Sequence, residues 1–177
     1  MLKKIKELTI DQLLNAHEWT DIEFKEAQNA VPKSAYETIS AFANTAGGYL
    51  VFGVKKDGQS FEVVGVKDVD KIQNDFVNTL RQKEKFSLIL DVTAQLQRFE
   101  DKDVLIFIVP EASKTDKPVY INGDIRRSFL RKGACDVRCS PEELQRLLND
   151  ASEIRYDTRI LDYNLNECFV DKDIQWY

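Results

Sequence analysis

Several features that assign proteins to functional classes are scarce or missing in this sequence. The longest uninterrupted apolar run spans residues 104–109, far short of the roughly 20 residues that a membrane helix needs. There are seven glycines and no Gly-x-x-x-x-Gly-Lys-Ser/Thr motif, so the phosphate cradle of P-loop NTPases is missing. The one histidine, His17, adjoins no Ser or Cys nucleophile motif. The sequence therefore argues against a membrane span, ATP hydrolysis and Ser-His-Asp catalysis by these residues.

Cysteine is also sparse. Cys135, Cys139 and Cys168 are odd in number and lack the paired spacing of a structural zinc site. The basic start, Met1 to Lys6, continues into acidic and polar residues instead of the apolar stretch of a signal peptide. Both observations favour a reducing compartment, and we expect a cytoplasmic location without a membrane partner.

Charge is present in quantity and unevenly spread. The 177 residues contain 25 Lys+Arg and 30 Asp+Glu, a net charge of −5. From Asp150 onward there are seven acids and three bases, a net of −4, which leaves −1 for residues 1–149. We therefore expect a nearly neutral domain over residues 1–152. Residues 153–177 are expected to form an acidic arm or linker that leads to further domains.

Hydrophobic periodicity predicts an α+β domain. Its helices are expected from Thr9 to about His17, from Pro32 to Gly47, over residues 70–80 and after Ser140. Strands are expected at residues 21–25, 49–54, 61–64, 88–98, 104–109, 118–121 and 126–131. Residues 104–109 do not alternate, as expected for a central strand covered on both faces. The fold class is therefore α+β, with a mixed, largely antiparallel sheet and packed helices.

Acidic side chains gather around the first strand. Glu18, Asp21 and Glu23 flank or occupy it, and Asp57 lies at the next turn. Carboxylates that converge on one edge can hold Mg²⁺ or Mn²⁺ and activate water for phosphodiester cleavage. The alternative is a solvated acidic face with Ile22 and Phe24 turned inward.

A basic segment stands out near the other end of the domain. Residues 125–138 carry five basic side chains and one acid, a net of +4, in an acidic protein. The Asn122-Gly123 pair predicts a hairpin joining residues 118–121 to 126–131. Such a hairpin could bind nucleic-acid phosphates, and Phe129 would either stack on a base or enter the core. The candidate nucleic-acid-binding residues are Arg126, Arg127, Arg131, Lys132 and Arg138.

Several motifs occur along the chain: Glu18-x4-Glu23-Phe24-Lys25, the stretch from Ile39 to Val54 with its Ala-Phe-Ala-Asn-x-x-Gly-Gly core, Asp57-Gly58 and Val64-Gly65. Together they resemble a known family, the Schlafen AlbA-like DNA-binding domain, earlier labelled a divergent AAA domain. Residues 117–133 also resemble the branch of this family found in bacterial transcriptional regulators and helicase-related proteins, and the similarity covers about residues 10–150. Asn44, Gly47 and Gly48 are expected to be structural, closing the helix and turning into a central strand.

The resemblance implies a DNA-binding module, typically N-terminal to an ATPase-like module and a winged helix. Schlafen proteins also include RNA endonucleases that use three carboxylates. Glu18 and Glu23 match two of them, while Lys55 and Lys56 stand at the third position and Asp57 is the nearest acid.

Our leading hypothesis from the sequence is a nucleic-acid-binding domain, with DNA as the partner and no cofactor, at the N-terminus of a bacterial transcriptional regulator. One alternative is a Schlafen-type endoribonuclease with Glu18, Glu23 and Asp57 as catalytic residues and Mg²⁺ or Mn²⁺ as cofactor. The other is an interaction module that forms a homodimer.

Overall fold

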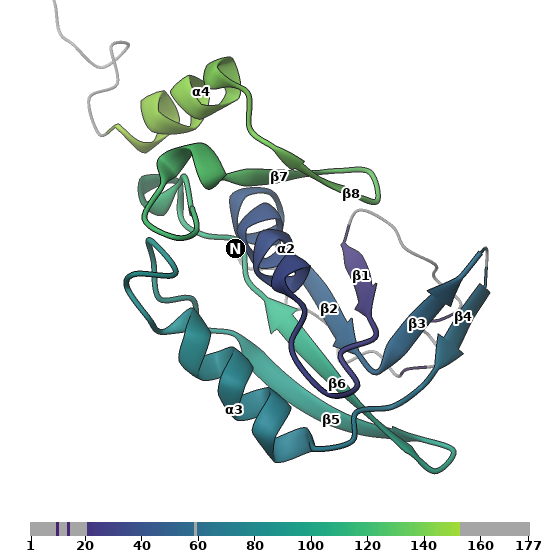
Figure 1. Ribbon diagram of the computed structural model, residues 1–177. Helices are drawn as coiled ribbons and strands as arrows, with labels where there is room; N and C mark the ends of the chain where they lie inside the picture. Colours follow the sequence, from purple (N-terminus) through teal and green to yellow (C-terminus); the bar gives the residue numbers. More distant parts are fainter. Residues whose placement is uncertain (1–9, 11–13, 15–20, 59, 153–177) are drawn as a thin grey trace, which may run out of the picture.

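A four-stranded sheet forms the centre of the computed structural model, which describes residues 10, 14, 21–58 and 60–152 (Figure 1). The strand order is β1 (Ile22–Lys25), β2 (Gly48–Phe52), β6 (Lys102–Val109) and β5 (Thr93–Phe99). β1 runs parallel to β2, whereas β2 with β6 and β6 with β5 are antiparallel. The mixed, largely antiparallel sheet is thus confirmed, with residues 104–109 in a central strand.

Hydrophobic side chains pack on both faces of this sheet. On one face, Leu50, Phe52 and Phe107 meet the helices α2 (Lys33–Asn44) and α3 (Val69–Leu80). On the other face, Tyr49, Val51 and Ile106 belong to a second cluster that includes Ile10 and part of a small hairpin. Burial on both faces explains why β2 and β6 read as unbroken apolar runs in the sequence.

The two helices begin where the sequence predicts. Pro32 precedes α2 in an extended conformation, and the Asp68 side chain accepts a hydrogen bond from the Lys71 amide at the start of α3. After α2 the chain turns at Gly47, whose φ of +76° is accessible to glycine at little cost. This turn leads directly into β2, as the Gly47-Gly48 pair predicts.

Two short hairpins lie outside the central sheet. The first joins β3 (Val54–Asp57) to β4 (Ser60–Val63) through the turn at Lys56-Asp57-Gly58. The strand expected over residues 49–54 is thus divided, because residues 48–52 form β2 of the central sheet and the hairpin begins only at Val54. The second, β7 (Phe129–Lys132) with β8 (Cys135–Arg138), passes over α2 and β1 (Figure 1). Helix α4 (Pro141–Ala151) follows, and Ser140 and Glu143 form a reciprocal capping box at its start.

Three further sequence predictions need correction. The basic segment pairs within itself as β7–β8, while the Asn122-Gly123 turn supports only an isolated bridge between Tyr120 and Ser128. A local turn motif does not determine which strands pair. Here the turn is followed by a 3-10 helix, η2 (Ile125–Arg127), instead of a strand. The strand expected over residues 88–98 begins only at Thr93.

The third correction concerns α4. The helical spacing of Leu144, Leu147 and Leu148 predicts an inward-facing stripe, but none of these residues is buried and Leu148 is 42% exposed. Among the elements that the structure describes, α4 makes its main contacts with the 3-10 helix η1 (Lys114–Asp116) and has no facing sheet to cover its apolar stripe.

The arm predicted over residues 153–177 and most of the helix predicted from Thr9 to His17 lie outside the described residues. Within the described ranges, no helix has the length and apolar content needed to cross a membrane.

Candidate nucleic-acid interface

The five candidate cations of the basic segment fall in three different places. Arg126 and Arg127 lie in η2, Arg131 and Lys132 in β7, and Arg138 at the end of β8. The antiparallel pairing places Arg138 opposite Phe129 and therefore brings it back beside η2. We call the exposed surface of Arg126, Arg127 and Arg138 the η2–β8 surface.

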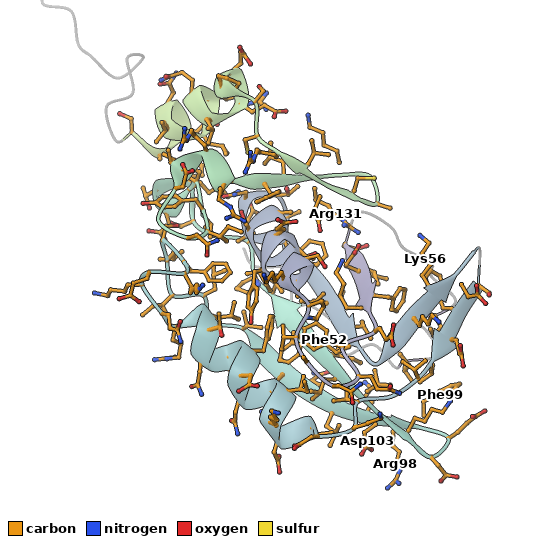
Figure 2. The ribbon with its side chains drawn as sticks, viewed as in Figure 1. Phe52, Lys56, Arg98, Phe99, Asp103 and Arg131 are labelled. Carbon is orange, nitrogen blue, oxygen red and sulfur yellow. The ribbon has the colours of Figure 1, made fainter. Side chains whose placement is uncertain are left out.

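Arg131 does not lie on an exposed face. Only 1% of its side chain is exposed, and its Nη1 atom lies 2.9 Å from Glu23 Oε2 and 2.8 Å from Asp136 Oδ1. Its Nη2 atom donates to the Ile22 carbonyl at 2.8 Å, and the guanidinium carbon lies 5.2 Å from the centre of the Phe42 ring. Figure 2 shows Arg131 between the β7–β8 hairpin and β1.

The burial of Arg131 corrects its predicted role as a phosphate contact. Two carboxylates and a backbone carbonyl compensate its charge, which makes burial of a guanidinium tolerable. Asp136 is itself fixed, because Thr38 Oγ1 donates to its Oδ2 atom at 2.6 Å. The same contacts place Glu23 in the interior, so the expectation that it faces solvent with Lys25 is also wrong.

The other cations of the segment remain accessible. The Arg126 side chain is 81% exposed and forms an ion pair with Asp124 at 3.0 Å. The hydrogen bond from the Arg126 side chain lowers the pKa of the Asp124 carboxyl below its usual value. Arg138 is exposed, and among the described residues no carboxylate lies within ion-pair distance of it.

Arg127 and Lys132 are more constrained. Arg127 is 35% exposed and lies 3.9 Å from Glu37, at the limit of an ion pair. Lys132 is 54% exposed, with its Nζ atom 2.6 Å from Glu143 Oε1 at the start of α4. The hydrogen bond from Lys132 lowers the pKa of the Glu143 carboxyl. A surface ion pair of this kind is weak enough for a phosphate to displace the carboxylate.

Phe129 packs in the core, which settles the two readings of that residue. It is 7% exposed and belongs to the hydrophobic cluster under α2. Its backbone is also held, since its amide donates to Ser40 Oγ at 3.1 Å and its carbonyl accepts from Asn44 Nδ2 at 3.0 Å. Phe129 is therefore unable to stack on a base in this structure.

The motif residues Asn44 and Gly48 hold the segments next to the basic residues in place. The Asn44 side chain bonds both polar groups of Val119, accepting from its amide at 2.7 Å and donating to its carbonyl at 2.8 Å. A Cβ atom on Gly48 would lie 2.8 Å from the Asp21 carbonyl oxygen and the Phe42 ring. These contacts fix the end of α2 against the segments that carry the basic residues.

The acidic candidates do not assemble a metal site in the described part of the chain. Glu23 is engaged by two cations, Arg131 and Lys25, which take the place that a divalent ion would need. Asp57 is exposed at the end of β3, and Glu18 lies outside the described residues. No group of three possible metal ligands occurs among the residues described.

Two exposed lysines beside the η2–β8 surface were not among the predicted site residues. Lys83 and Lys85 lie in the loop between α3 and β5, and the Lys85 carbonyl accepts a hydrogen bond from the Asn122 amide at 2.8 Å. The run Arg81-Gln-Lys-Glu-Lys85 is a visible charge signal in the sequence. Its position next to residue 122 depends on tertiary pairing, which periodicity does not indicate.

Comparison with known proteins agrees with this architecture. The family described as Schlafen, AlbA_2 matches residues 18–140, which is most of the chain and nearly all of its described part. The chain belongs to the Schlafen AlbA_2 family. The match ends at Ser140, so the domain of this family contains the sheet, α2, α3 and both hairpins but stops where α4 begins.

Solved structures show the same AlbA_2 fold. The N-terminal domain of a RecG-related protein from Nitrosomonas europaea is 35% identical, with a TM-score of 0.53 over 72% of this chain and 88% of that domain. A protein from Corynebacterium diphtheriae shares the fold at 19% identity and a TM-score of 0.50, over 75% of this chain and 24% of that one.

A curated relative is much longer than this chain. A Ureaplasma parvum protein described as an uncharacterized ATP-binding protein is 27% identical over 159 residues, which cover 77% of this chain and 43% of that protein. The chain thus spans less than half the length of this relative.

Proposed function

We propose that this AlbA_2 domain binds nucleic acid, with DNA as the preferred partner, through phosphate contacts made by the η2–β8 surface. The observation that carries the proposal is that two exposed arginines, Arg126 and Arg138, both act on the charge of the Asp124 carboxyl, while Arg138 has no carboxylate within ion-pair distance in the described part of the chain. Guanidinium groups of this kind bind phosphate oxygens in two-point hydrogen bonds. Lys132 and Arg127 flank them and add positive charge.

Relatives support a nucleic-acid setting. The Nitrosomonas europaea domain comes from a protein named for its relation to the ATP-dependent DNA helicase RecG. That name fits a domain that holds DNA while another part of the polypeptide acts on it. Because this chain lacks a P-loop motif, ATP-dependent steps in such a protein belong to other residues.

We also propose that the domain serves a transcriptional regulator as its N-terminal module. Contacts to phosphates provide affinity without reading sequence, so a regulator would choose its operator with another part of the protein. Competition with duplexes of unrelated sequence tests this division. All competitor duplexes are expected to displace a labelled duplex from the 177-residue chain equally well. A strong preference of the chain for one sequence would contradict this division.

The direct test is a salt titration with a labelled duplex of about 20 base pairs and the double variant Arg126→Ala/Arg138→Ala. Each lost phosphate contact removes about 0.9 from the slope of log K against log salt, so the slope is expected to fall by about 2. Affinity at low salt should fall at least about tenfold. The matched control is Arg98→Ala/Lys55→Ala, two exposed cations on β5 and β3.

Two outcomes would overturn the proposal. One is absence of salt-dependent binding of the wild-type chain to either DNA or RNA. The other is equal loss of affinity in the variant and in the control, since that would indicate a general charge effect and not a site.

A further inference from the structure

Four short segments from three parts of the sequence run side by side at the η2–β8 surface. Tyr120 pairs with Ser128, and Phe86 pairs with Ile121, each through an isolated antiparallel bridge. The Cys139 amide extends the series by donating to the Ser128 carbonyl at 2.9 Å. The segments, in spatial order, are residues 85–87, 120–122, 126–128 and 138–139.

This series fixes the position of the α3–β5 loop relative to η2. The Ser87 amide donates to the Tyr120 carbonyl at 3.1 Å, and the Tyr120 amide donates back to Ser87 Oγ at 3.0 Å. On the other side, the Ile121 amide donates to the Arg127 carbonyl at 3.2 Å. The loop is therefore held to the η2–β8 surface by hydrogen bonds.

Lys85 and Arg126 lie on opposite sides of residues 121–122. On one side the Asn122 amide donates to the Lys85 carbonyl, and on the other the Ile121 amide donates to the carbonyl of Arg127, the neighbour of Arg126. Both side chains are exposed, and Lys83 adds a second exposed ammonium group two residues before Lys85. Cations are thus presented on both sides of the Asn122-Gly123 turn.

The charge of the combined surface is positive. The cations are Arg81, Lys83, Lys85, Arg126, Arg127 and Arg138, and the nearby acids are Glu37, Glu84 and Asp124. Six positive and three negative charges give a net of +3 in a protein whose total is −5. Among the described residues, no carboxylate lies within ion-pair distance of Lys83 or Lys85.

The chemistry of this surface favours phosphates over bases. Recognition of single strands relies on aromatic side chains that stack on bases, and Phe129 is buried. A duplex presents two rows of phosphates on either side of a groove, about 12 Å wide for the major groove of B-DNA. Exposed cations on both sides of the Asn122-Gly123 turn suit two such rows of phosphates.

We infer that the α3–β5 loop and the η2–β8 surface form one bipartite site, which contacts the two phosphate backbones across a groove of double-stranded DNA. This inference rests on the proposed function and adds to it the loop, the second backbone and the duplex form of the partner. Lys83 and Lys85 contact one backbone, and Arg126 and Arg138 contact the other.

The test compares the full 177-residue chain with Lys83→Ala/Lys85→Ala on a labelled duplex of about 20 base pairs and on one of its single strands. The control is Lys55→Ala/Lys67→Ala, two exposed lysines on β3 and in the β4–α3 loop. The loop variant is expected to lose about tenfold in duplex affinity and up to about 2 in salt slope, while the control keeps both. The wild-type chain is expected to bind the duplex more tightly than the single strand.

The results separate this inference from the proposed function. If Arg126→Ala/Arg138→Ala weakens binding but Lys83→Ala/Lys85→Ala does not, the bipartite site is wrong and the η2–β8 surface stands. If the single strand binds as tightly as the duplex, the two-backbone contact is wrong. Absence of any binding by the wild-type chain overturns both proposals.

Discussion

Arg131 connects three parts of the molecule through a single side chain. Its guanidinium joins Glu23 of β1 to Asp136 of β8. Its backbone amide donates a hydrogen bond to Oγ1 of Thr45, the residue that follows α2, at 3.0 Å. Glu23 also pairs with Lys25, so among the described ion pairs it is Asp136 that depends on Arg131 for its opposite charge. Arg131 is thus a structural residue of the hairpin that carries the exposed cations.

Removing Arg131 is expected to destabilise the fold. Arg131→Met keeps the aliphatic stem but leaves Glu23 and Asp136 without their shared partner, which costs about 3–5 kcal/mol when a buried ion pair is broken. Thermal unfolding followed by circular dichroism should show a lower midpoint by roughly 10 °C. The control Arg126→Ala removes an exposed cation and should leave the midpoint nearly unchanged. Equal stability of Arg131→Met and wild type would show that the network adds nothing.

For individual residues, the sequence predicted which side chains carry positive charge better than it predicted which of them are exposed. Arg126 and Arg138 are exposed as expected, but Arg131 looked the same in a run of basic residues. Because charged residues are mostly exposed in folded proteins, the sequence alone leads us to expect an exposed arginine at position 131. Its burial depends on an ion pair with Glu23, which is more than 100 positions away in the sequence, and a local sequence pattern does not indicate a partner at such a separation.

Among the elements, the turn from α2 into β2 is the most tightly determined. Gly47 has a φ of +76°, and a Cβ atom there would lie 2.6 Å from the Val109 carbonyl oxygen of β6. Asn44 closes the preceding helix by bonding both polar groups of Val119. The Ala-Phe-Ala-Asn-x-x-Gly-Gly stretch therefore encodes a close approach of helix, turn and strand.

Alanine substitutions of Gly47 and of Gly58, which lies in the β3–β4 turn, separate backbone strain from steric clash. A positive φ costs a residue with a Cβ atom about 1–2 kcal/mol, and Gly58→Ala at φ +62° is expected to cost that amount because no described atom lies within 4 Å of the added carbon. Gly47→Ala adds a backbone clash on top of the same strain, so its cost should exceed that of Gly58→Ala by at least about 1 kcal/mol. Urea denaturation of the two variants measures the difference. Equal midpoints would mean that β6 moves away without penalty.

The elements predicted correctly are those whose signals are local. Capping residues predicted the starts of α3 and α4, and a continuous apolar run predicted the central strand β6. The Asn122-Gly123 turn was recognised, but its strands were assigned wrongly because β7 pairs with β8 instead. The inward face predicted for α4 failed for a related reason, since amphipathic spacing does not show whether a facing surface exists.

For the molecule as a whole, the layering predicts an order of local stability. β2 and β6 are paired on both edges and covered on both faces, whereas β3 pairs only with β4 in a separate two-stranded sheet. Amides open more readily where few apolar contacts hold the backbone. Hydrogen exchange read by mass spectrometry should find residues 48–52 and 104–109 the slowest and residues 54–57 much faster. Protection of residues 54–57 equal to that of β6 would contradict this order.

The whole-molecule charge is a poor guide to the partner of this protein. The net of −5 would argue against a polyanion, but the positive surface is assembled from the α3–β5 loop, η2 and β8. The sequence identified the contribution of residues 125–138 because those cations are contiguous. It did not identify Lys83 and Lys85, which join them only after Phe86 pairs with Ile121.

The contact between Arg131 and the Ile22 carbonyl also affects how this protein meets other chains. Because the Tyr49 amide donates to the Asp21 carbonyl and the Gly53 amide to the Lys25 carbonyl, the Ile22 carbonyl points away from β2, toward the edge of β1 that pairs with no described strand. An open strand edge is a template on which foreign strands add and aggregation begins. By occupying an acceptor on that edge with a side chain of its own, the protein withholds one of the hydrogen bonds that an incoming strand would need.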